Sequence, residues 1–219
     1  MSVNVKRRLF ETLAILGKAL SSATRLELLD FLAQGERSVE RLAGLANVSV
    51  ASASQHLQTL LRAGLVTNRR EGQKVYYSLS DDSIITLMGG MRVVAERNIA
   101  EMERLIATFL KTKDALDPVA PADLIKMIEN DAVVIIDVRP ADEYRMGHIP
   151  GSINIPFKEL EGRAREVLGD REIIAYCRGP YCLLSYDAVT HFRSIGQPAR
   201  RLEDGFPEWK NAHHPVERE

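Results

Sequence analysis

The two cysteines of this 219-residue chain, Cys177 and Cys182, lie five positions apart and are the residues best suited to chemistry. Cys177 directly follows the apolar run 172–176, which predicts a buried strand, and the loop that it opens precedes a predicted helix. A thiol there faces the backbone N–H groups of the loop and the positive end of the helix, beside Arg178. This setting favours a thiolate, which can attack the outer sulfur of a donor and hold it as a persulfide.

Cys182 has two interpretations. As a resolving cysteine it attacks a persulfide on Cys177, which releases sulfide and leaves a disulfide. As a bystander it packs beneath the loop, a common fate for a cysteine at the start of a helix. The spacing of five residues leaves both interpretations open.

A metal centre is a further interpretation of the cysteine pair, and the sequence argues against it. A structural zinc site needs four ligands, usually Cys and His. His191, His213 and His214 are distant from the pair in sequence, and paired histidines near a C-terminus are usually solvated. We therefore expect no metal and no cofactor.

The elements around the cysteine loop alternate between short apolar runs and helical stretches. Residues 133–138 and 172–176 are continuous apolar runs of the kind found in parallel strands that are buried on both faces. Helices are predicted at 122–129, 142–146, 160–168 and 183–195. The second half is therefore predicted to be an α/β domain whose parallel sheet is covered by helices on both sides.

The first half is mainly helical. Leucine and phenylalanine at helical spacing predict a first helix around residues 9–16. Three serines, Ser22, Ser38 and Ser49, are predicted to cap helices at 23–33, 39–45 and 50–63. The last two helices flank a tight turn, which is the helix-turn-helix arrangement.

The helix predicted at 50–63 has no bulky apolar group on one face of its first turns. Such a face can enter a major groove, because Ser, Gln and His hydrogen-bond to base edges without burying a fixed charge. A hairpin follows, with strands at 65–67 and 75–79 and a basic turn that can reach phosphates or a minor groove. The residues predicted to contact double-stranded operator DNA are Ser49, Ser52, Ser54, Gln55, His56, Arg69, Arg70 and Lys74.

A long helix is predicted after Asp81 or Asp82, with a seam of steps of four and three from Ile84 to Phe109. The seam suits pairing with a second helix, which in a homodimer would set two recognition helices about one DNA turn, ~34 Å, apart. Alternatively, the helix packs on its own domain. Two glycines at 89–90 weaken a continuous coil in either case. The predicted dimer-interface residues are Met88, Met91, Met102, Leu105 and Phe109.

The change of pattern predicts a domain boundary. We predict a DNA-binding and dimerisation domain at residues 1–111, a linker at 112–121 that contains two X-Pro steps, and a second domain at 122–219. Residues 1–117 hold 16 Lys and Arg against 13 Asp and Glu, whereas residues 118–219 hold 13 against 17. The basic half is thus the half predicted to bind DNA.

The composition, 45% hydrophobic and 27% charged, is typical of a globular protein. No apolar run approaches the roughly 20 residues that span a bilayer, and residues 1–8 lack the apolar core of a signal peptide. We therefore expect a cytoplasmic protein without a membrane partner.

Residues 20–79 resemble the ArsR family of dimeric winged-helix repressors, on the segments ATRLELLDFL, SVASASQHLQTLLRAGLV and GQKVYYSL. The resemblance implies a mainly α winged helix-turn-helix domain that binds DNA. Many members sense metals through a cysteine pair in the helix before the turn, and others sense sulfur species through cysteines in their outer helices. Here the matching stretch, 36–41, has no cysteine, and the DNA-binding half lacks the usual thiols.

The second half, from about residue 118 to 216, is similar to a single rhodanese domain. The segments that carry the similarity are DVR at 137–139, GHIPG at 147–151, NIP at 154–156, YCRG at 176–179 and DGFPEW at 204–209. The similarity implies that Cys177 is the nucleophile. It also implies that the loop from Arg178 to Cys182 cradles an anion. We therefore predict Cys177, Arg178 and Cys182 as the catalytic residues, and Gly179, Pro180 and Tyr181 as the cradle of the anion or persulfide. The matches at Asp137, Arg139, His148 and Trp209 imply structural roles.

Two departures from the rhodanese pattern matter. Sulfurtransferases of that family often carry a basic or hydroxyl residue at the sixth loop position, which Cys182 occupies here. A phosphatase-like relative needs an arginine six residues after its cysteine, where this chain has Leu183. Phosphate-ester and arsenate chemistry are therefore not expected.

These observations leave three hypotheses for function. In the first, a homodimer binds operator DNA, and sulfur loading or oxidation at Cys177 by a small donor, such as thiosulfate or a persulfide, changes that binding. In the second, the rhodanese domain is a sulfurtransferase enzyme and the DNA-binding half controls its own gene. In the third, the chain is a repressor with an inert ligand-binding module.

Overall fold

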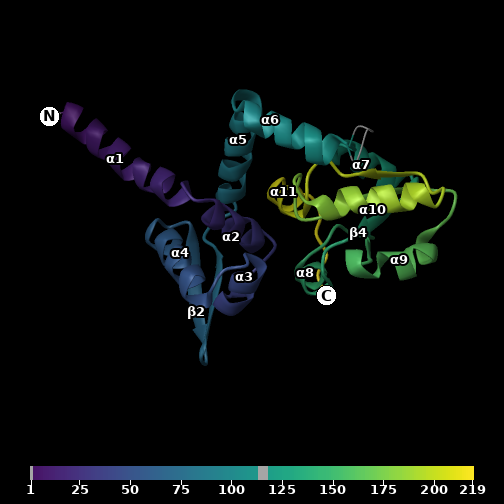
Figure 1. Ribbon diagram of the computed structural model, residues 1–219, viewed down its shortest axis with the longest axis horizontal. Coiled ribbons are helices and arrows are strands. Elements are labelled where there is room, and N and C mark those ends of the chain that lie inside the picture. The colour runs from purple at the N-terminus through teal and green to yellow at the C-terminus, as the bar shows by residue number, and fades with distance from the viewer. Residues whose placement is uncertain (1, 113–117) are drawn as a thin grey trace. The chain divides into compact units, whose positions relative to one another are not determined.

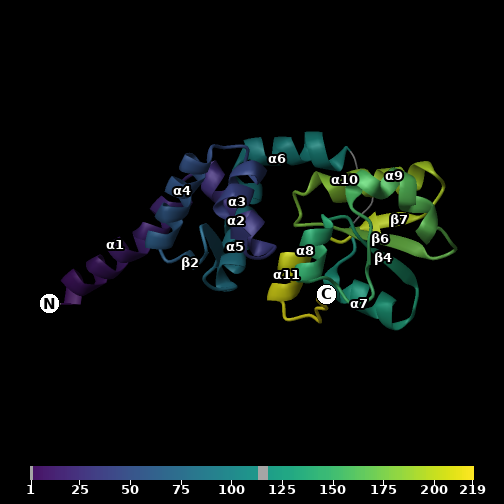
Figure 2. The ribbon, with the colours of Figure 1, turned by 90° about the horizontal axis from the view of Figure 1, so that it is seen from below.

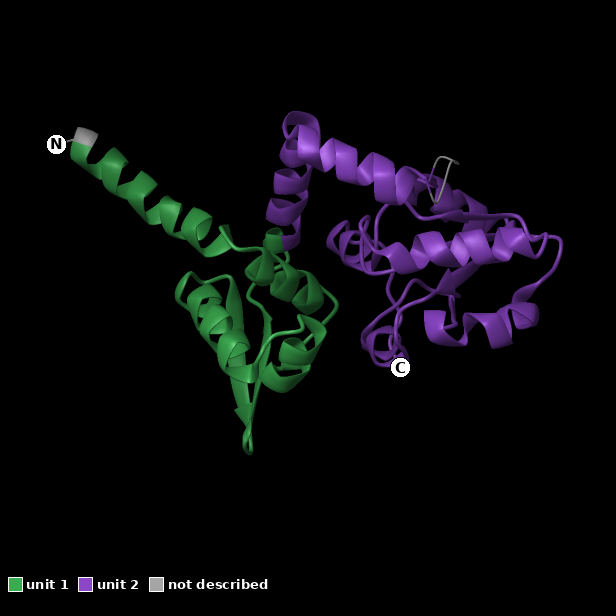
Figure 3. Cartoon of the chain, in the orientation of Figure 1, with its two compact units in different colours: residues 1–84 green, residues 85–219 purple. Residues whose placement is uncertain are grey.

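The computed structural model describes residues 2–112 and 118–219. The chain divides into two compact units, residues 1–84 and 85–219 (Figure 3). The predicted linker, 112–121, belongs to the second unit, and its residues 113–117 lie outside the described part; the boundaries at 111 and 122 stay a prediction. None of the described helices combines the length and apolar composition that a bilayer span requires.

The first unit consists of helices and a small antiparallel sheet (Figure 1). Its helices are α1 (Ser2–Leu20), α2 (Ala23–Ala33), α3 (Val39–Leu45) and α4 (Val50–Arg62). Its strands are β1 (Arg37–Ser38), β2 (Val66–Glu71) and β3 (Lys74–Leu79), in the order β1-β3-β2. The helices α3 and α4 form the predicted helix-turn-helix, and the hairpin of β2 and β3 forms the wing.

Local sequence signals begin these helices. The hydroxyl of Ser38 accepts a hydrogen bond from the N–H of Arg41 at 3.3 Å, and that of Ser49 from the N–H of Ser52 at 3.1 Å, so both predicted caps are confirmed. Ser22 occupies the N-cap position of α2, but its side chain makes no capping hydrogen bond. The predicted side-chain cap at Ser22 is therefore wrong, and extended backbone alone begins α2 there.

Replacing Ser49 with alanine is expected to destabilise α4 by about 1 kcal/mol, because the N–H of Ser52 loses its acceptor. Amide hydrogen exchange across α4 in the full chain measures this loss. Ser22→Ala is the matched control, since it removes a hydroxyl that makes no cap and should leave the exchange of α2 nearly unchanged. Equal losses in the two variants would contradict the assignment of Ser49 as a cap.

The wing is a longer hairpin than the sequence indicated. Its two strands pair up to Glu71 and Lys74, so only residues 72–73 form the turn. Gly72, with φ of 59°, supplies the left-handed conformation that such a turn requires. Arg69 and Arg70, predicted in a seven-residue turn, therefore lie within β2. The alternation of apolar and polar residues did not indicate the full length of β2, because every β2 residue after the first is exposed.

The predicted long helix is two helices. They are α5 (Ser83–Asn98), which begins in the first unit, and α6 (Ala100–Ile106), which a π-helical turn (Ala107–Lys111) follows. Ile99 leaves helical geometry with φ of −112° and ψ of 102°, and the side-chain Nδ2 of Asn98 donates to the carbonyl of Val94 at 2.8 Å. The single continuous seam predicted from Ile84 to Phe109 is therefore wrong.

The rest of the second unit is an α/β fold. Four parallel strands, β4 (Val133–Asp137), β5 (Ile153–Asn154), β6 (Glu172–Tyr176) and β7 (Ala199–Arg201), lie in the order β5-β4-β6-β7. The α-helices are α7 (Pro121–Glu129), α8 (Ala141–Met146), α9 (Leu160–Arg163), α10 (Leu183–Ser194) and α11 (Phe206–Asn211), with 3₁₀ turns at Phe157–Glu159 and Ala164–Val167. The two predicted strands are β4 and β6, the central pair. The strands β5 and β7 were not predicted, because two or three residues carry no readable period.

Helices cover both faces of this sheet, as predicted; Figure 2 shows α9 and α10 on one side and α7 on the other. One apolar cluster joins Ile173 of β6 to Phe192 of α10. The opposite cluster joins Ile174 of β6 to Leu124 of α7 and Trp209 of α11. Successive residues of β6 thus face opposite layers, which is why the strand is apolar throughout.

Candidate functional site

Cys177 lies at the carboxyl end of β6, where the sequence predicted it. Its side chain is 1% exposed and belongs to the apolar cluster beneath α10. The carbonyl of Cys177 accepts a hydrogen bond from the N–H of Phe206 at 3.0 Å. Cys182 is the N-cap residue of α10 and is half-buried. The core thus fixes one end of the loop, and a helix start fixes the other.

The sulfur atoms of Cys177 and Cys182 are in disulfide contact, with Cα atoms 6.2 Å apart. This separation lies inside the usual disulfide range of roughly 4.4–6.8 Å. The loop therefore brings both thiols together, as a resolving reaction between them requires. In this bridged state, Cys177 is sealed from solvent.

Hydrogen bonds within the loop and to α10 shape the bridge. The N–H of Cys182 donates to the carbonyl of Gly179 at 3.0 Å, which closes a tight turn. The buried hydroxyl of Tyr186 donates to the carbonyl of Pro180 at 3.3 Å, and the hydroxyl of Ser185 donates to the carbonyl of Cys182 at 3.0 Å. The first turn of α10 is therefore part of the loop's scaffold.

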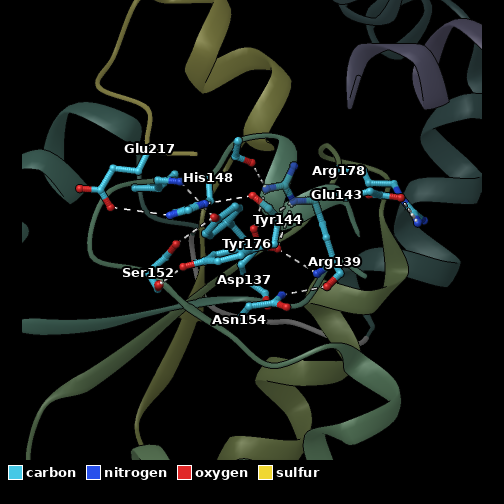
Figure 4. A network of polar contacts seen from close by, with 12 residues as sticks. Asp137, Arg139, Glu143, Tyr144, His148, Ser152, Asn154, Tyr176, Arg178 and Glu217 are labelled. Atoms are coloured by element: carbon cyan, nitrogen blue, oxygen red, sulfur yellow. Dashed lines mark hydrogen bonds and ion pairs between the residues drawn. The ribbon is translucent and has the colours of Figure 1, made fainter. Parts of the chain in front are cut away.

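Arg178 forms a bidentate ion pair with Glu143 of α8 (Figure 4). Its Nε and Nη2 atoms lie 2.8 and 2.7 Å from the two carboxylate oxygens. The Glu143 side chain is fully buried, and that of Arg178 is 17% exposed. The charge of Arg178 is thus balanced by a carboxylate, so the backbone N–H groups and the helix terminus carry more of any thiolate stabilisation than the sequence suggested.

The segment 204–209 supports the loop from beneath. A Cβ atom added at Gly205 would overlap the backbone of Arg178 and Gly179, so only glycine fits this contact. Glu208 of α11 accepts a hydrogen bond from the N–H of Gly205 at 3.1 Å. Burial raises the pKa of Glu208 above its usual range. This segment is one of those that carry the resemblance to rhodanese, but the sequence did not predict its contact with the cysteine loop.

A buried polar network fixes the strand ends behind the loop (Figure 4). Asp137 and Arg139 are fully buried and form an ion pair with Nη2 and Oδ2 2.6 Å apart. Arg139 also donates to the carbonyl of Gly147 at 2.7 Å. The hydroxyl of Tyr176 lies 3.1 Å from that of Ser152, and burial raises the pKa of Tyr176. We assign these residues to the scaffold, because their polar groups are satisfied internally.

A second candidate site lies on the first unit, along the exposed face of α4. Ser54, Gln55 and His56 line a shallow hollow of about 430 Å³. Arg25 of α2 and Arg62 of α4 line the same hollow, and sequence reasoning did not select either of them. Their side chains bring positive charge beside the residues predicted to read bases.

The wing residues differ in how free their charges are. Arg69 pairs with Glu36 and Glu71, each at 2.5 Å, and its guanidinium stacks 4.7 Å from the centre of the Tyr76 ring. The hydrogen bonds to the two carboxylates raise the pKa of Arg69. Its charge is therefore balanced by Glu71 of the wing and by Glu36, which directly precedes β1. Arg70, whose Nε donates to the carbonyl of Gly72 at 3.3 Å, and Lys74 are exposed.

Comparison with known proteins gives a family match within each of the two units. Residues 22–68 match the model of the bacterial regulatory protein, arsR family, and residues 120–212 match that of the rhodanese-like domain. The HTH-type transcriptional regulator Rv0324 of Mycobacterium tuberculosis is 42% identical over 212 residues, which cover 97% of this chain and 93% of that protein. The chain belongs to the ArsR family of transcriptional regulators and carries a rhodanese-like domain.

Two solved structures resemble parts of this ArsR-family regulator. The homodimeric winged helix-turn-helix DNA-binding domain of a possible ArsR-family regulator from Mycobacterium bovis is 40% identical, with a TM-score of 0.40. The match covers 43% of the regulator and 87% of the chain from Mycobacterium bovis. A rhodanese-related protein from Thermoplasma volcanium is 29% identical, with a TM-score of 0.43 over 48% of the regulator and all of that chain.

The predicted dimer residues of the regulator lie on α5, α6 and the π-helical turn. Met91, Leu105 and Phe109 are 39%, 42% and 58% exposed. Met88 and Met102 are half-buried. The break at Ile99 divides these residues between two helices, so they do not form one straight seam.

Proposed function

We propose that this regulator binds operator DNA as a homodimer and that a sulfane-sulfur donor, taken up at Cys177, changes its operator affinity. The observation that carries the proposal is the contact between Cys177 and Cys182 within one loop at the end of β6. Two thiols in such a loop can exist as a dithiol or as a disulfide. A sensor needs such a pair of states, since a signal can only shift an equilibrium between them.

The proposed chemistry begins with the reduced loop. The thiolate of Cys177 attacks the sulfane sulfur of thiosulfate, the sulfur–sulfur bond of the donor breaks, and sulfite leaves with the bonding electron pair. Cys177 then carries a persulfide. The thiolate of Cys182 attacks the Sγ atom of Cys177, and hydrosulfide leaves with the electron pair. The two cysteines are oxidised to a disulfide and the sulfane sulfur is reduced to sulfide; one of the two thiol protons leaves on the hydrosulfide and the other goes to water.

The position of Cys182 favours a switch over a turnover enzyme. A sulfurtransferase must deliver its persulfide to an external acceptor, whereas Cys182 already lies within bridging distance of Cys177. Groups held together in this way react at a very high effective concentration, so the internal acceptor should win. The buried state of Cys177 in the bridged loop then prevents a second turnover until a reductant opens it.

We propose that α4 and the wing contact the operator. Ser54, Gln55 and His56 have access to base edges, and the exposed Arg70 and Lys74 have access to phosphates. The capping role of Ser49 and the ion pairs of Arg69 support a positioning role for these two residues. Arg25 and Arg62 join the proposed interface because they line the same hollow as the base-reading side chains.

The homodimer is supported by the apolar surface that one chain leaves uncovered. Among the described side chains of α1, the large apolar residues that are at least 50% exposed are Val5, Leu9, Phe10, Leu13 and Ile15. Side chains of this kind gathered on one helix mark a surface that a partner covers. Sedimentation equilibrium should therefore give a dimer mass, and a monomer at micromolar concentration would contradict the proposal.

The decisive experiment compares operator affinity at fixed salt before and after treatment with thiosulfate or a polysulfide. In the wild type we expect a change of tenfold or more, about 1.4 kcal/mol, and in Cys177→Ser no change. Cys182→Ser is the matched control for the second step: intact mass should show a persulfide on Cys177 without sulfide release. A wild type that takes up no sulfane sulfur, or whose affinity does not respond, would overturn the proposal.

A further inference from the structure

A hydrogen bond joins the cysteine loop to α5, and both belong to the second unit. The hydroxyl of Tyr181, the residue directly before Cys182, donates to the carboxylate of Glu96 at 2.6 Å. Partial burial, and then the carboxylate of Glu96, raise the pKa of Tyr181, so the hydroxyl stays a donor at neutral pH. The side chain next to the bridged Cys182 is therefore tied to a helix outside the rhodanese fold.

A second set of contacts joins α5 to the support beneath the loop. The guanidinium of Arg92 lies 3.4 Å from the carboxylate of Asp204 and 3.5 Å from that of Glu208. Between these two acids is Gly205, whose backbone abuts the loop. The Arg92 side chain is 22% exposed and also lies 4.0 Å from Glu96. Arg92 thus links Glu96, the hydrogen-bond partner of Tyr181, to the segment 204–209 that supports the cysteine loop.

The same helix is connected to the wing. Strand β3 ends at Leu79, and α5 begins at Ser83, where the N–H of Ser83 donates to the carboxylate of Asp81 at 2.6 Å. Met91, a predicted dimer residue, directly precedes Arg92 in α5. A continuous helix moves as one body, so a displacement at Glu96 reaches both the predicted dimer face and the wing connection.

We propose that Glu96 and Arg92 are positioning residues of the cysteine loop, and that α5 transmits the state of the loop to the DNA-binding unit. The transmission rests on the proposed function, whereas the positioning does not. Closure of the disulfide fixes Cys182 and places Tyr181 on Glu96, and opening of the loop releases that contact. Because such coupling is reciprocal, removal of the contact must shift the equilibrium of the disulfide itself.

The first test measures that equilibrium in the full chain. The protein is equilibrated with mixtures of reduced and oxidised dithiothreitol, free thiols are alkylated, and intact mass gives the dithiol fraction. We expect Glu96→Ala to shift the equilibrium toward the dithiol by about fivefold or more. Glu101→Ala is the matched control, since its carboxylate forms an exposed pair with Arg104 in α6, and it should stay close to wild type.

A thermodynamic cycle makes this test specific. Tyr181→Phe should shift the disulfide equilibrium in the same direction as Glu96→Ala, which also removes the ion pair with Arg92. The double variant should shift it no further than Glu96→Ala alone, because both variants remove the same contact between Tyr181 and Glu96. Additive shifts, or a wild-type equilibrium in Glu96→Ala, would overturn the positioning role.

The second test measures the ratio of operator affinities between the dithiol and disulfide forms. We expect the wild-type ratio of tenfold or more to fall below about twofold in Glu96→Ala and to persist in Glu101→Ala. An intact ratio in Glu96→Ala overturns transmission through α5. If the dithiol and disulfide forms of the wild type bind the operator equally well while Glu96→Ala still shifts the disulfide equilibrium, the proposed function fails and the positioning role stands.

Discussion

Replacement of Arg139 with alanine is expected to lower the free energy of unfolding of the second unit by about 3–5 kcal/mol. The carboxylate of Asp137 is fully buried and receives two hydrogen bonds from Nε and one from Nη2 of Arg139, at 2.6–3.1 Å. Without Arg139 this buried carboxylate loses the cation that pairs with it. The carbonyl of Gly147 loses its donor, and the ring of Phe206 loses a cation 4.2 Å from its centre.

Urea unfolding followed by tryptophan fluorescence measures this loss, because Trp209 is the single tryptophan of the chain and is buried in the second unit. Arg163→Ala is the matched control. Arg163 pairs with Glu159 and Glu166 on the surface, so its loss should cost less than about 1 kcal/mol. A loss in Arg139→Ala as small as that of the control would contradict a structural role for the buried pair.

Replacement of Gly205 with alanine is expected to slow closure of the Cys177–Cys182 disulfide by about a hundredfold. The new methyl group overlaps the backbone of Arg178 and Gly179, so either the loop or the segment 204–209 must move. A displacement of about 1 Å between reacting groups can cost a factor of that size.

The closure rate follows from quenching the reduced protein with an alkylating reagent at intervals after addition of diamide, with thiols counted by intact mass. Gly162→Ala provides the comparison, since a Cβ added at Gly162 in α9 meets no atom within 4 Å. It should close at the wild-type rate. Closure of Gly205→Ala at the same rate would show that the loop does not depend on its support.

The sequence alone determined the elements whose signals are local. Ser38 and Ser49 began their helices because a serine hydroxyl reaches an N–H only three residues away. The runs in β4 and β6 were readable because a strand buried on both faces has no polar position. The place of Cys177 at the end of β6 followed, together with the resemblance that implied both domains.

Only the tertiary structure decided how charged side chains are paired. Arg178 pairs with Glu143, and Arg69 with Glu36, across separations of 35 and 33 residues. The contact between Tyr181 and Glu96 spans 85 residues. The sequence around a charged side chain contains no periodic pattern that predicts its ion-pair partner, because that partner depends on which strands and helices meet in space. The fold therefore settled which cations are engaged internally and which helix touches the cysteine loop.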